Sequence, residues 1–269
     1  MNIGKLIRLN RLFAHPSGRL CSIAVDHFIG YGDGLPPNLA AMKPTLAAIV
    51  AADPDAVTMH KGIAASLWQP YAGRLPLIIQ SSLAKVDGTA FEQLATAEDA
   101  VRLGADAIAV AIFIRGNTEA ASLRMVGDVV RDATRFELPV ICHVYPRRFE
   151  GGPHVSYTPE DIAWAVHCVT EVGVDVVKAP YCGNVAAHAE IVANCPTPIV
   201  AAGGPKTNTL AEALNMVSEV VQSGALGATI GRNVWGFPNI TANVQAFCSV
   251  IHDGMTPQQA MANAGLAPA

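Results

Sequence analysis

A short apolar run followed by a helix-like segment is repeated eight times along this chain of 269 residues. The runs consist mostly of valine, isoleucine, alanine and leucine without polar alternation, which is typical of strands buried on both faces of a parallel sheet. They lie at residues 20–26, 55–59, 77–81, 106–112, 139–145, 174–179, 198–203 and 226–231. Eight such units, about thirty residues apart, predict an α/β protein built as a closed (β/α)8 TIM barrel, with an open doubly wound sheet as the rival fold.

The segments between the runs carry the signals of helix starts and ends. Residues 159–172 and 209–223 have polar faces, and Thr158 precedes a proline and two acidic residues, a pattern that predicts a capped helix start. Glycines where helices commonly end precede three of the predicted strands, namely Gly104, Gly173 and Gly224. No linker or shift in composition divides the chain, so we expect one domain over residues 1–269.

Composition narrows the classes of function. Charged residues make up 15% of the chain and the formal net charge is −4, which argues against a nucleic-acid-binding surface. No apolar run is long enough to cross a membrane, and no signal peptide is recognisable in the first twenty residues. The six cysteines lack metal-type spacing and predict free thiols in a reducing, cytoplasmic compartment. The apolar fraction of 51% favours a homo-oligomer.

Active sites of (β/α)8 barrels lie at the carboxyl ends of the strands. The predicted strand ends carry polar side chains that concentrate at this rim, namely Asp26, His27, His60, Gln80, Arg115, His143, Tyr145, Lys178 and Arg232. Side chains alternate along a strand, so Val174 and Val176 are expected to share the inward face with Lys178. By the same rule, His143 is expected one layer beneath Tyr145.

Lys178 is the most informative residue of this set, because it ends a valine-rich run. In water about one lysine amine in two thousand is neutral at pH 7. A desolvated pocket with a second cation nearby lowers the pKa and frees the amine to attack a carbonyl. Lys206 and the apolar side chains of Val176 and Val177 are the expected causes of such a shift. The alternative is a lysine that extends into solvent.

Two glycine-rich turns predict a phosphate site. Residues 202–206 (Ala-Gly-Gly-Pro-Lys) follow the seventh run, and residues 231–233 (Gly-Arg-Asn) follow the eighth. In barrels the loops after strands seven and eight often bind phosphate through bare backbone amides. Glycine permits the close approach, and Arg232 supplies a guanidinium that chelates phosphate oxygens.

Six motifs in order along the chain carry a resemblance to a known family. They are Ala24-Val25-Asp26-His27, Met59-His60-Lys61-Gly62, Val144-Tyr145-Pro146-Arg147, Val177-Lys178, Ala202-Gly203-Gly204-Pro205-Lys206 and Gly231-Arg232-Asn233. With them the chain resembles the archaeal-type (DhnA/DeoC-like) class I fructose-bisphosphate aldolase family. That family includes aminodideoxyheptulosonate synthase and autoinducer-2 phosphate thiolase relatives.

The resemblance implies a site and a reaction. Lys178 would form a Schiff base, Tyr145 would donate a proton, and Asp26 would act near the scissile bond. The implied substrate- and phosphate-binding residues are His27, His143, Arg147, Ala202, Gly203, Gly204, Lys206, Gly231 and Arg232. The implied enzyme is a class I aldolase, a carbon–carbon lyase acting on a phosphorylated ketose with a donor of the dihydroxyacetone phosphate type.

The chain also departs from the family pattern. Phe28 and Arg148 stand where relatives commonly have glycine, and Ala202 stands where sugar aldolases often have serine. The exact substrate therefore stays open, as do three alternatives: a transaldolase-like heptulosonate synthase, a coenzyme A-dependent thiolase on the same scaffold, and a non-catalytic phosphosugar-binding barrel.

No cofactor or metal is expected. His27, His60 and His143 match no standard metal-ligand spacing, and chemistry through an iminium ion needs no metal. The expected partner is a phosphorylated sugar or ketone, with neither nucleic acid nor membrane.

Overall fold

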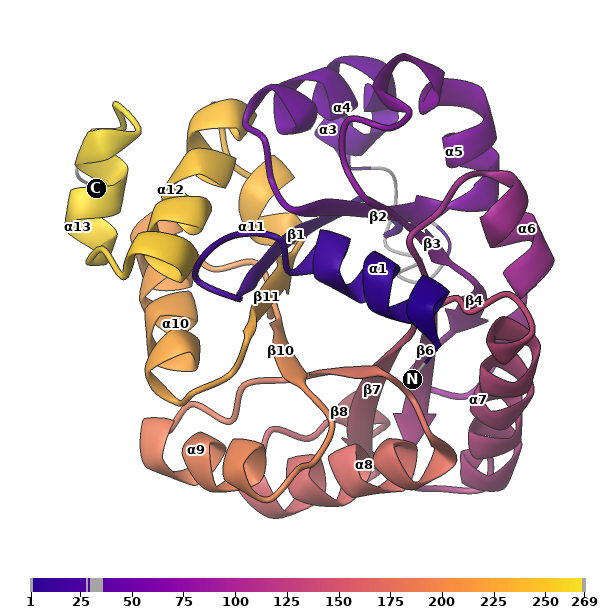
Figure 1. Ribbon diagram of the computed structural model, residues 1–269. Helices are drawn as coiled ribbons and strands as arrows, with labels where there is room; N and C mark the ends of the chain where they lie inside the picture. Colours follow the sequence, from indigo (N-terminus) through magenta and orange to yellow (C-terminus); the bar gives the residue numbers. More distant parts are fainter. Residues whose placement is uncertain (1, 28, 30–35, 268–269) are drawn as a thin grey trace.

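The chain folds into a closed parallel barrel (Figure 1). The computed structural model describes residues 2–27, 29 and 36–267; Phe28 lies outside the described residues. The barrel strands are β1 (Leu20–Ala24), β2 (Ala56–His60), β3 (Leu77–Gln80), β6 (Ala107–Ile114), β7 (Val140–Arg148), β9 (Val176–Ala179), β10 (Ile199–Ala202) and β11 (Gly227–Ile230). They pair in the order β6-β3-β2-β1-β11-β10-β9-β7, and β6 pairs with β7 to close the ring. The predicted (β/α)8 barrel is confirmed, and the open sheet is excluded by this closure.

Helices surround the strands. They are α3 (Pro37–Ala40), α4 (Met42–Ala51), α5 (Lys61–Leu67), α6 (Ala97–Arg102), α7 (Glu119–Thr134), α8 (Pro159–Val172), α9 (Val185–Ala193), α10 (Leu210–Gln222), α11 (Arg232–Trp235), α12 (Ile240–Asp253) and α13 (Pro257–Asn263), with a short 3-10 turn η1 (Gln69–Tyr71). The cap signals act as predicted: the Thr158 side chain accepts from the Asp161 amide, and Gly173 ends α8 with a φ of +94°. Among the described residues, no helix combines the length and apolar character that crossing a bilayer requires.

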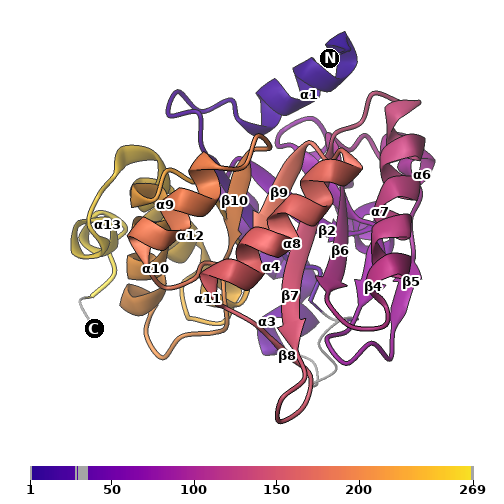
Figure 2. The same cartoon turned by 90° about the horizontal axis from the view of Figure 1, so that it is seen from below.

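Strand alternation divides the core into two parts. Outward-facing residues such as Val57, Ile108 and Val177 pack against the helices. Inward-facing residues fill the half of the barrel where the strands begin, namely Leu20, Ala56, Ile78, Ala107, Ala109, Ile141, Val176 and Val200. Helix α1 (Ile3–Leu12) lies across the end where the strands begin and adds Leu12 to this inner cluster (Figure 2). The barrel is therefore closed at that end.

Three short strands extend the opposite rim. β4 (Ser82–Ala84) and β5 (Phe91–Gln93) form an antiparallel hairpin after β3, and β8 (His154–Val155) pairs antiparallel with the end of β7. Both additions stand beside the carboxyl ends of the barrel strands. They extend the barrel wall on either side of its open mouth. The assignment of residues 1–269 to one domain stays a prediction.

Candidate active site

A cavity of about 610 Å³ opens at the carboxyl ends of the strands. Each barrel strand contributes at least one lining residue. Ten of the predicted site residues line it, namely Asp26, His27, His143, Tyr145, Lys178, Ala202, Gly203, Gly204, Gly231 and Arg232. A volume of this size fits a small phosphorylated metabolite.

Lys178 lies inside this cavity and is 6% exposed. Burial lowers the pKa of its amine to about 8; the negative charge of Asp26 opposes this shift and the positive charge of Arg232 adds to it. Val176 lies beneath Lys178 in the inner cluster, as predicted, whereas Val174 and Val177 pack on the helix side. The prediction that Lys206 and Val177 lower this pKa is therefore wrong, because the cation acting on Lys178 is Arg232.

A chain of polar contacts connects Asp26 to the side chains around it. The Gln80 amide donates to Asp26 Oδ2 at 3.1 Å and to His143 Nδ1 at 3.3 Å, and His27 Nδ1 lies 3.3 Å from Asp26 Oδ1. Burial alone would raise the pKa of Asp26, but the His27 contact and the positive charge of Lys178 lower it far below its usual range. Asp26 is thus held as a carboxylate. It is a partner for the positive charge of Lys178.

His143 lies beneath Tyr145, as strand alternation predicted, and both face the cavity. Burial, together with the positive charge of Lys178, lowers the pKa of His143 well below its usual value. The ring is therefore neutral at pH 7, with Nδ1 accepting from Gln80. Phe113, opposite Tyr145 on β6, packs against the Tyr145 ring with centroids 5.7 Å apart.

The two glycine turns meet at one side of the cavity. A Cβ on Gly203 would lie 2.9 Å from Ile230 Cα, and one on Gly231 would overlap the His27 ring, so neither position accepts a larger residue without rearrangement. Asn233 ties the turns together: its amide donates to Gly203 O at 2.8 Å and to Pro205 O at 2.9 Å. Arg232 Nη2 donates to Gly204 O at 3.0 Å.

Two predicted binding residues do not line the cavity. The buried guanidinium of Arg147 donates to Arg115 O at 2.9 Å, to Val86 O at 3.0 Å and to Thr118 Oγ1. Lys206 is exposed, and its Nζ lies 3.9 Å from the centre of the Phe237 ring. Their predicted substrate contacts are corrected on this ground: Arg147 braces the rim and Lys206 packs on the outside of its loop.

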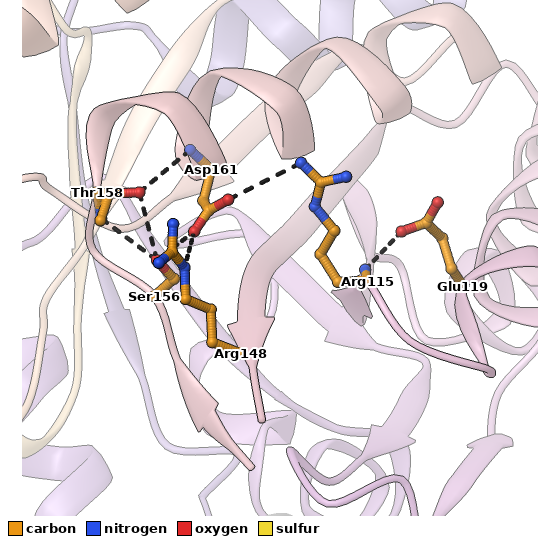
Figure 3. A network of polar contacts seen from close by, with 6 residues as sticks. All are labelled: Arg115, Glu119, Arg148, Ser156, Thr158 and Asp161. Carbon is orange, nitrogen blue, oxygen red and sulfur yellow. Dashed lines mark hydrogen bonds and ion pairs between the residues drawn. The ribbon is translucent and has the colours of Figure 1, made fainter. Parts of the chain in front are cut away.

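The segment after β7 is fixed by Asp161 near the start of α8 (Figure 3). Asp161 Oδ2 accepts from Ser156 Oγ and from Arg148 Nε, both at 2.6 Å, and its Oδ1 lies 3.8 Å from the Arg115 guanidinium. Arg148 is therefore occupied by a carboxylate of the protein itself. The anchored segment brings His154, Val155 and Tyr157 to the cavity wall.

The sequence alone indicates no role for several of these residues. Gln80 stands only at the end of a predicted strand, and Asn233 only within a motif. The alternation rule identifies Gln80 and Phe113 as inward-facing residues, once the strand ends are known. No signal in the sequence marks Tyr157, because a loop, not a strand, places it.

Comparison with known proteins agrees with this geometry. Residues 21–236 match the profile of the DeoC/LacD family aldolases. The chain is 31% identical to a 2-amino-4,5-dihydroxy-6-oxo-7-(phosphonooxy)heptanoate synthase from Streptomyces griseus, over 97% of this chain and 95% of the relative. It is 33% identical to a 2-amino-3,7-dideoxy-D-threo-hept-6-ulosonate synthase from Halobacterium salinarum, over 98% and 97% of the two chains.

A solved structure with the same fold is an archaeal fructose-1,6-bisphosphate aldolase whose catalytic lysine is covalently bound to the carbinolamine intermediate of the substrate. It superposes with a TM-score of 0.81 at 28% identity and covers 92% of this chain and 99% of its own. The predicted class of enzyme, a Schiff-base aldolase that makes or breaks carbon–carbon bonds, is confirmed by these comparisons. The chain belongs to the DeoC/LacD aldolase family.

Proposed function

We propose that this protein is a class I aldolase that cleaves or forms a carbon–carbon bond in a phosphorylated ketose, with Lys178 as the Schiff-base residue. The observation that carries the proposal is the buried Lys178 amine in one cavity with Arg232 and the glycine turns. A donor of the dihydroxyacetone phosphate type fits this arrangement. Its phosphate would bind at Gly203, Gly204, Gly231 and Arg232, and its carbonyl would meet the lysine.

The reaction starts with attack of the neutral Lys178 amine on the ketone carbon, which gives a carbinolamine. Loss of water gives a positively charged iminium ion, which withdraws electrons from the neighbouring carbon–carbon bond. That bond breaks, its electron pair forms an enamine, and the aldehyde fragment leaves. Protonation of the enamine and hydrolysis of the iminium ion then release the donor and restore the amine.

Three neighbouring groups support these steps. The Asp26 carboxylate stabilises the positive iminium ion and accepts the hydroxyl proton that cleavage releases. Tyr145 carries the proton to and from the enamine carbon. Gln80 is a positioning residue, because its two amide protons hold the Asp26 carboxylate and the neutral His143 ring at fixed places.

Reduction with sodium borohydride tests the proposal. With dihydroxyacetone phosphate present, reduction should attach the donor irreversibly to Lys178, and mass spectrometry of the digested protein should locate the added mass. Protein without the donor is the control. No added mass, or mass on a lysine other than Lys178, would contradict the proposal and would favour a non-catalytic phosphosugar-binding barrel.

The rate of this trapping should rise with pH across a defined window. With a pKa of about 8, about a tenth of the Lys178 amines are neutral at pH 7 and half at pH 8. We therefore expect the initial trapping rate to increase about fivefold from pH 7 to pH 8 and to level off above pH 9. A rate that keeps rising tenfold per pH unit up to pH 10 would show an ordinary lysine.

The coenzyme A-dependent thiolase alternative is separable by assay. Turnover that requires added coenzyme A would favour it, whereas turnover with dihydroxyacetone phosphate and an aldehyde alone supports the aldolase. A cytoplasmic location, a homo-oligomeric assembly and independence from cofactors and metals stay predictions.

A further inference from the structure

The cavity has two chemically different sides. The barrel order β1-β2-β3-β6-β7-β9-β10-β11 places β3 and β6 across the ring from β10 and β11. The glycine turns and Arg232 follow β10 and β11, so the proposed phosphate site lies on one side. Lys178 on β9 and Asp26 after β1 lie on either side of that site. The side formed by β3, β4 and β6 is therefore the one most distant from the phosphate.

Apart from Gln80, Ser82 and His154, the residues that line this distant side are apolar. We define the apolar wall as the cavity-lining residues Leu83, Ala84, Val86, Ala111, Phe113 and Val155. Ser82 lies beside them, but its hydroxyl donates to Ala111 O at 3.1 Å and accepts from Ala111 N at 2.7 Å. Its hydrogen-bonding capacity is thus largely used within the protein. The wall offers a ligand mainly hydrocarbon surface.

The three arginines near the apolar wall do not line the cavity, because they bind other groups of the protein. Arg115 and Arg148 point to Asp161 (Figure 3), and the Arg115 guanidinium also stacks 4.5 Å from the centre of the Trp164 ring. Arg147 is occupied by the carbonyls of Arg115 and Val86. Among the described residues that line the cavity, the lysine and arginine side chains are Lys178 and Arg232, and the histidines are His27, His60, His143 and His154. The sequence of residues 28 and 30–35 adds no lysine, arginine or histidine.

We propose that the aldehyde acceptor carries an apolar side chain and no phosphate. This proposal rests on the proposed function, because it assumes that the donor phosphate binds at Arg232 and the donor carbonyl reacts with Lys178. In the synthetic direction the enamine carbon of the donor attacks the aldehyde carbon. The carbonyl oxygen takes a proton and becomes the new hydroxyl, and the iminium ion is hydrolysed. The side chain of the aldehyde then extends away from the phosphate, toward the apolar wall.

The energetics distinguish the two kinds of acceptor. A phosphate placed against hydrocarbon loses its hydration without gaining a counter-charge, which is costly. An aliphatic side chain placed there gains from burial, and one methylene group in a fitted apolar pocket changes specificity by about tenfold or more. The apolar wall therefore selects against a second phosphate and in favour of a longer hydrocarbon chain, up to the size of the cavity.

Aldol addition with the wild-type protein tests the proposal. Dihydroxyacetone phosphate is held constant, and kcat/KM is measured for propanal, butanal, pentanal and glyceraldehyde 3-phosphate. We expect kcat/KM to rise several-fold or more with each added methylene and to be at least about tenfold lower for the phosphorylated aldehyde than for pentanal. Equal or higher kcat/KM for glyceraldehyde 3-phosphate would overturn the proposal.

A charge added to the wall provides a second test. Leu83→Lys should raise kcat/KM for glyceraldehyde 3-phosphate about tenfold relative to pentanal. Gln93→Lys adds the same charge to the same hairpin at an exposed position that does not line the cavity, and it should leave the ratio unchanged. An unchanged ratio in Leu83→Lys, or the same shift in both variants, would contradict a role of the wall in selection.

The proposed function and this inference fail in different ways. Borohydride trapping with dihydroxyacetone phosphate alone involves no acceptor. Loss of trapping in the wild-type protein would reject the Schiff-base function. Normal trapping combined with a preference for the phosphorylated aldehyde would reject only the apolar acceptor. Trapping by Leu83→Lys also verifies that this variant retains a folded donor site.

Discussion

Replacing Lys178 by methionine should abolish turnover and stabilise the fold. Methionine keeps the length and apolar stem of lysine but has no amine to attack a carbonyl. The amine also costs stability in the wild type, because burial lowers its pKa from 10.5 to about 8. At 1.36 kcal/mol per pKa unit, this difference corresponds to about 3 kcal/mol at pH 7. We therefore expect Lys178→Met to raise the free energy of unfolding by about 3 kcal/mol at pH 7.

The size of this effect depends on pH in a way that identifies its cause. The lysine of the unfolded chain binds its proton more tightly than the folded one, so the penalty is complete below about pH 8. The penalty disappears as pH rises past 10.5, the pKa of the lysine in the unfolded chain. Urea unfolding of wild type and variant between pH 7 and pH 10 measures the difference, which should shrink as pH rises.

A matched control removes a different lysine. Lys43 on α4 is exposed, and Lys43→Met should alter the free energy of unfolding by less than about 0.5 kcal/mol at any pH in this range. It should also retain turnover and borohydride trapping. If Lys178→Met were destabilising at pH 7, the lysine would be held in its charged form by partners that contribute more than burial costs.

The fold was predictable because the chemistry of a buried parallel strand is local. Short runs of valine, isoleucine and alanine bounded by turn residues are typical of buried strands, and each of the eight predicted runs overlaps a strand. Thr158 and Gly173 mark α8 at its two ends for the same reason. Helix α1 and the β4–β5 hairpin were not predicted. Their positions depend on the surfaces they cover, and the sequence of each segment alone does not specify such a surface.

The residues that line the cavity were predictable from the strand ends and the glycine turns, whereas the positions of two long cationic side chains were predicted wrongly. Asp26, Tyr145 and Lys178 follow from strand ends that converge at one rim. Arg147 and Lys206 were assigned by motif, but motif position does not fix the direction of a long flexible side chain. Arg147 finds backbone carbonyls and Lys206 finds an aromatic ring, and each of these contacts directs the charge away from the cavity.

The division of labour between Asp26 and Tyr145 follows from their environments. A group that gives up a proton must hold one at working pH. Asp26 does not, because His27 and Lys178 keep its pKa far below the usual range despite burial. The Tyr145 hydroxyl, on the neighbouring strand β7, faces the same cavity as Lys178, and Phe113 packs against its ring. We therefore propose separate roles for the two residues, acceptance of a proton by Asp26 and delivery of one by Tyr145.

Tyr145→Phe should reduce kcat by a factor of about 10² to 10⁴, the usual contribution of a positioned acid or base. The aromatic ring and its contact with Phe113 stay, so donor binding and borohydride trapping should be retained. Deuterium exchange at the enamine carbon of dihydroxyacetone phosphate, followed by NMR without acceptor, should slow by the same factor. Tyr71→Phe removes a hydroxyl outside the cavity and should have no effect. Normal exchange in Tyr145→Phe would show that another group moves the proton.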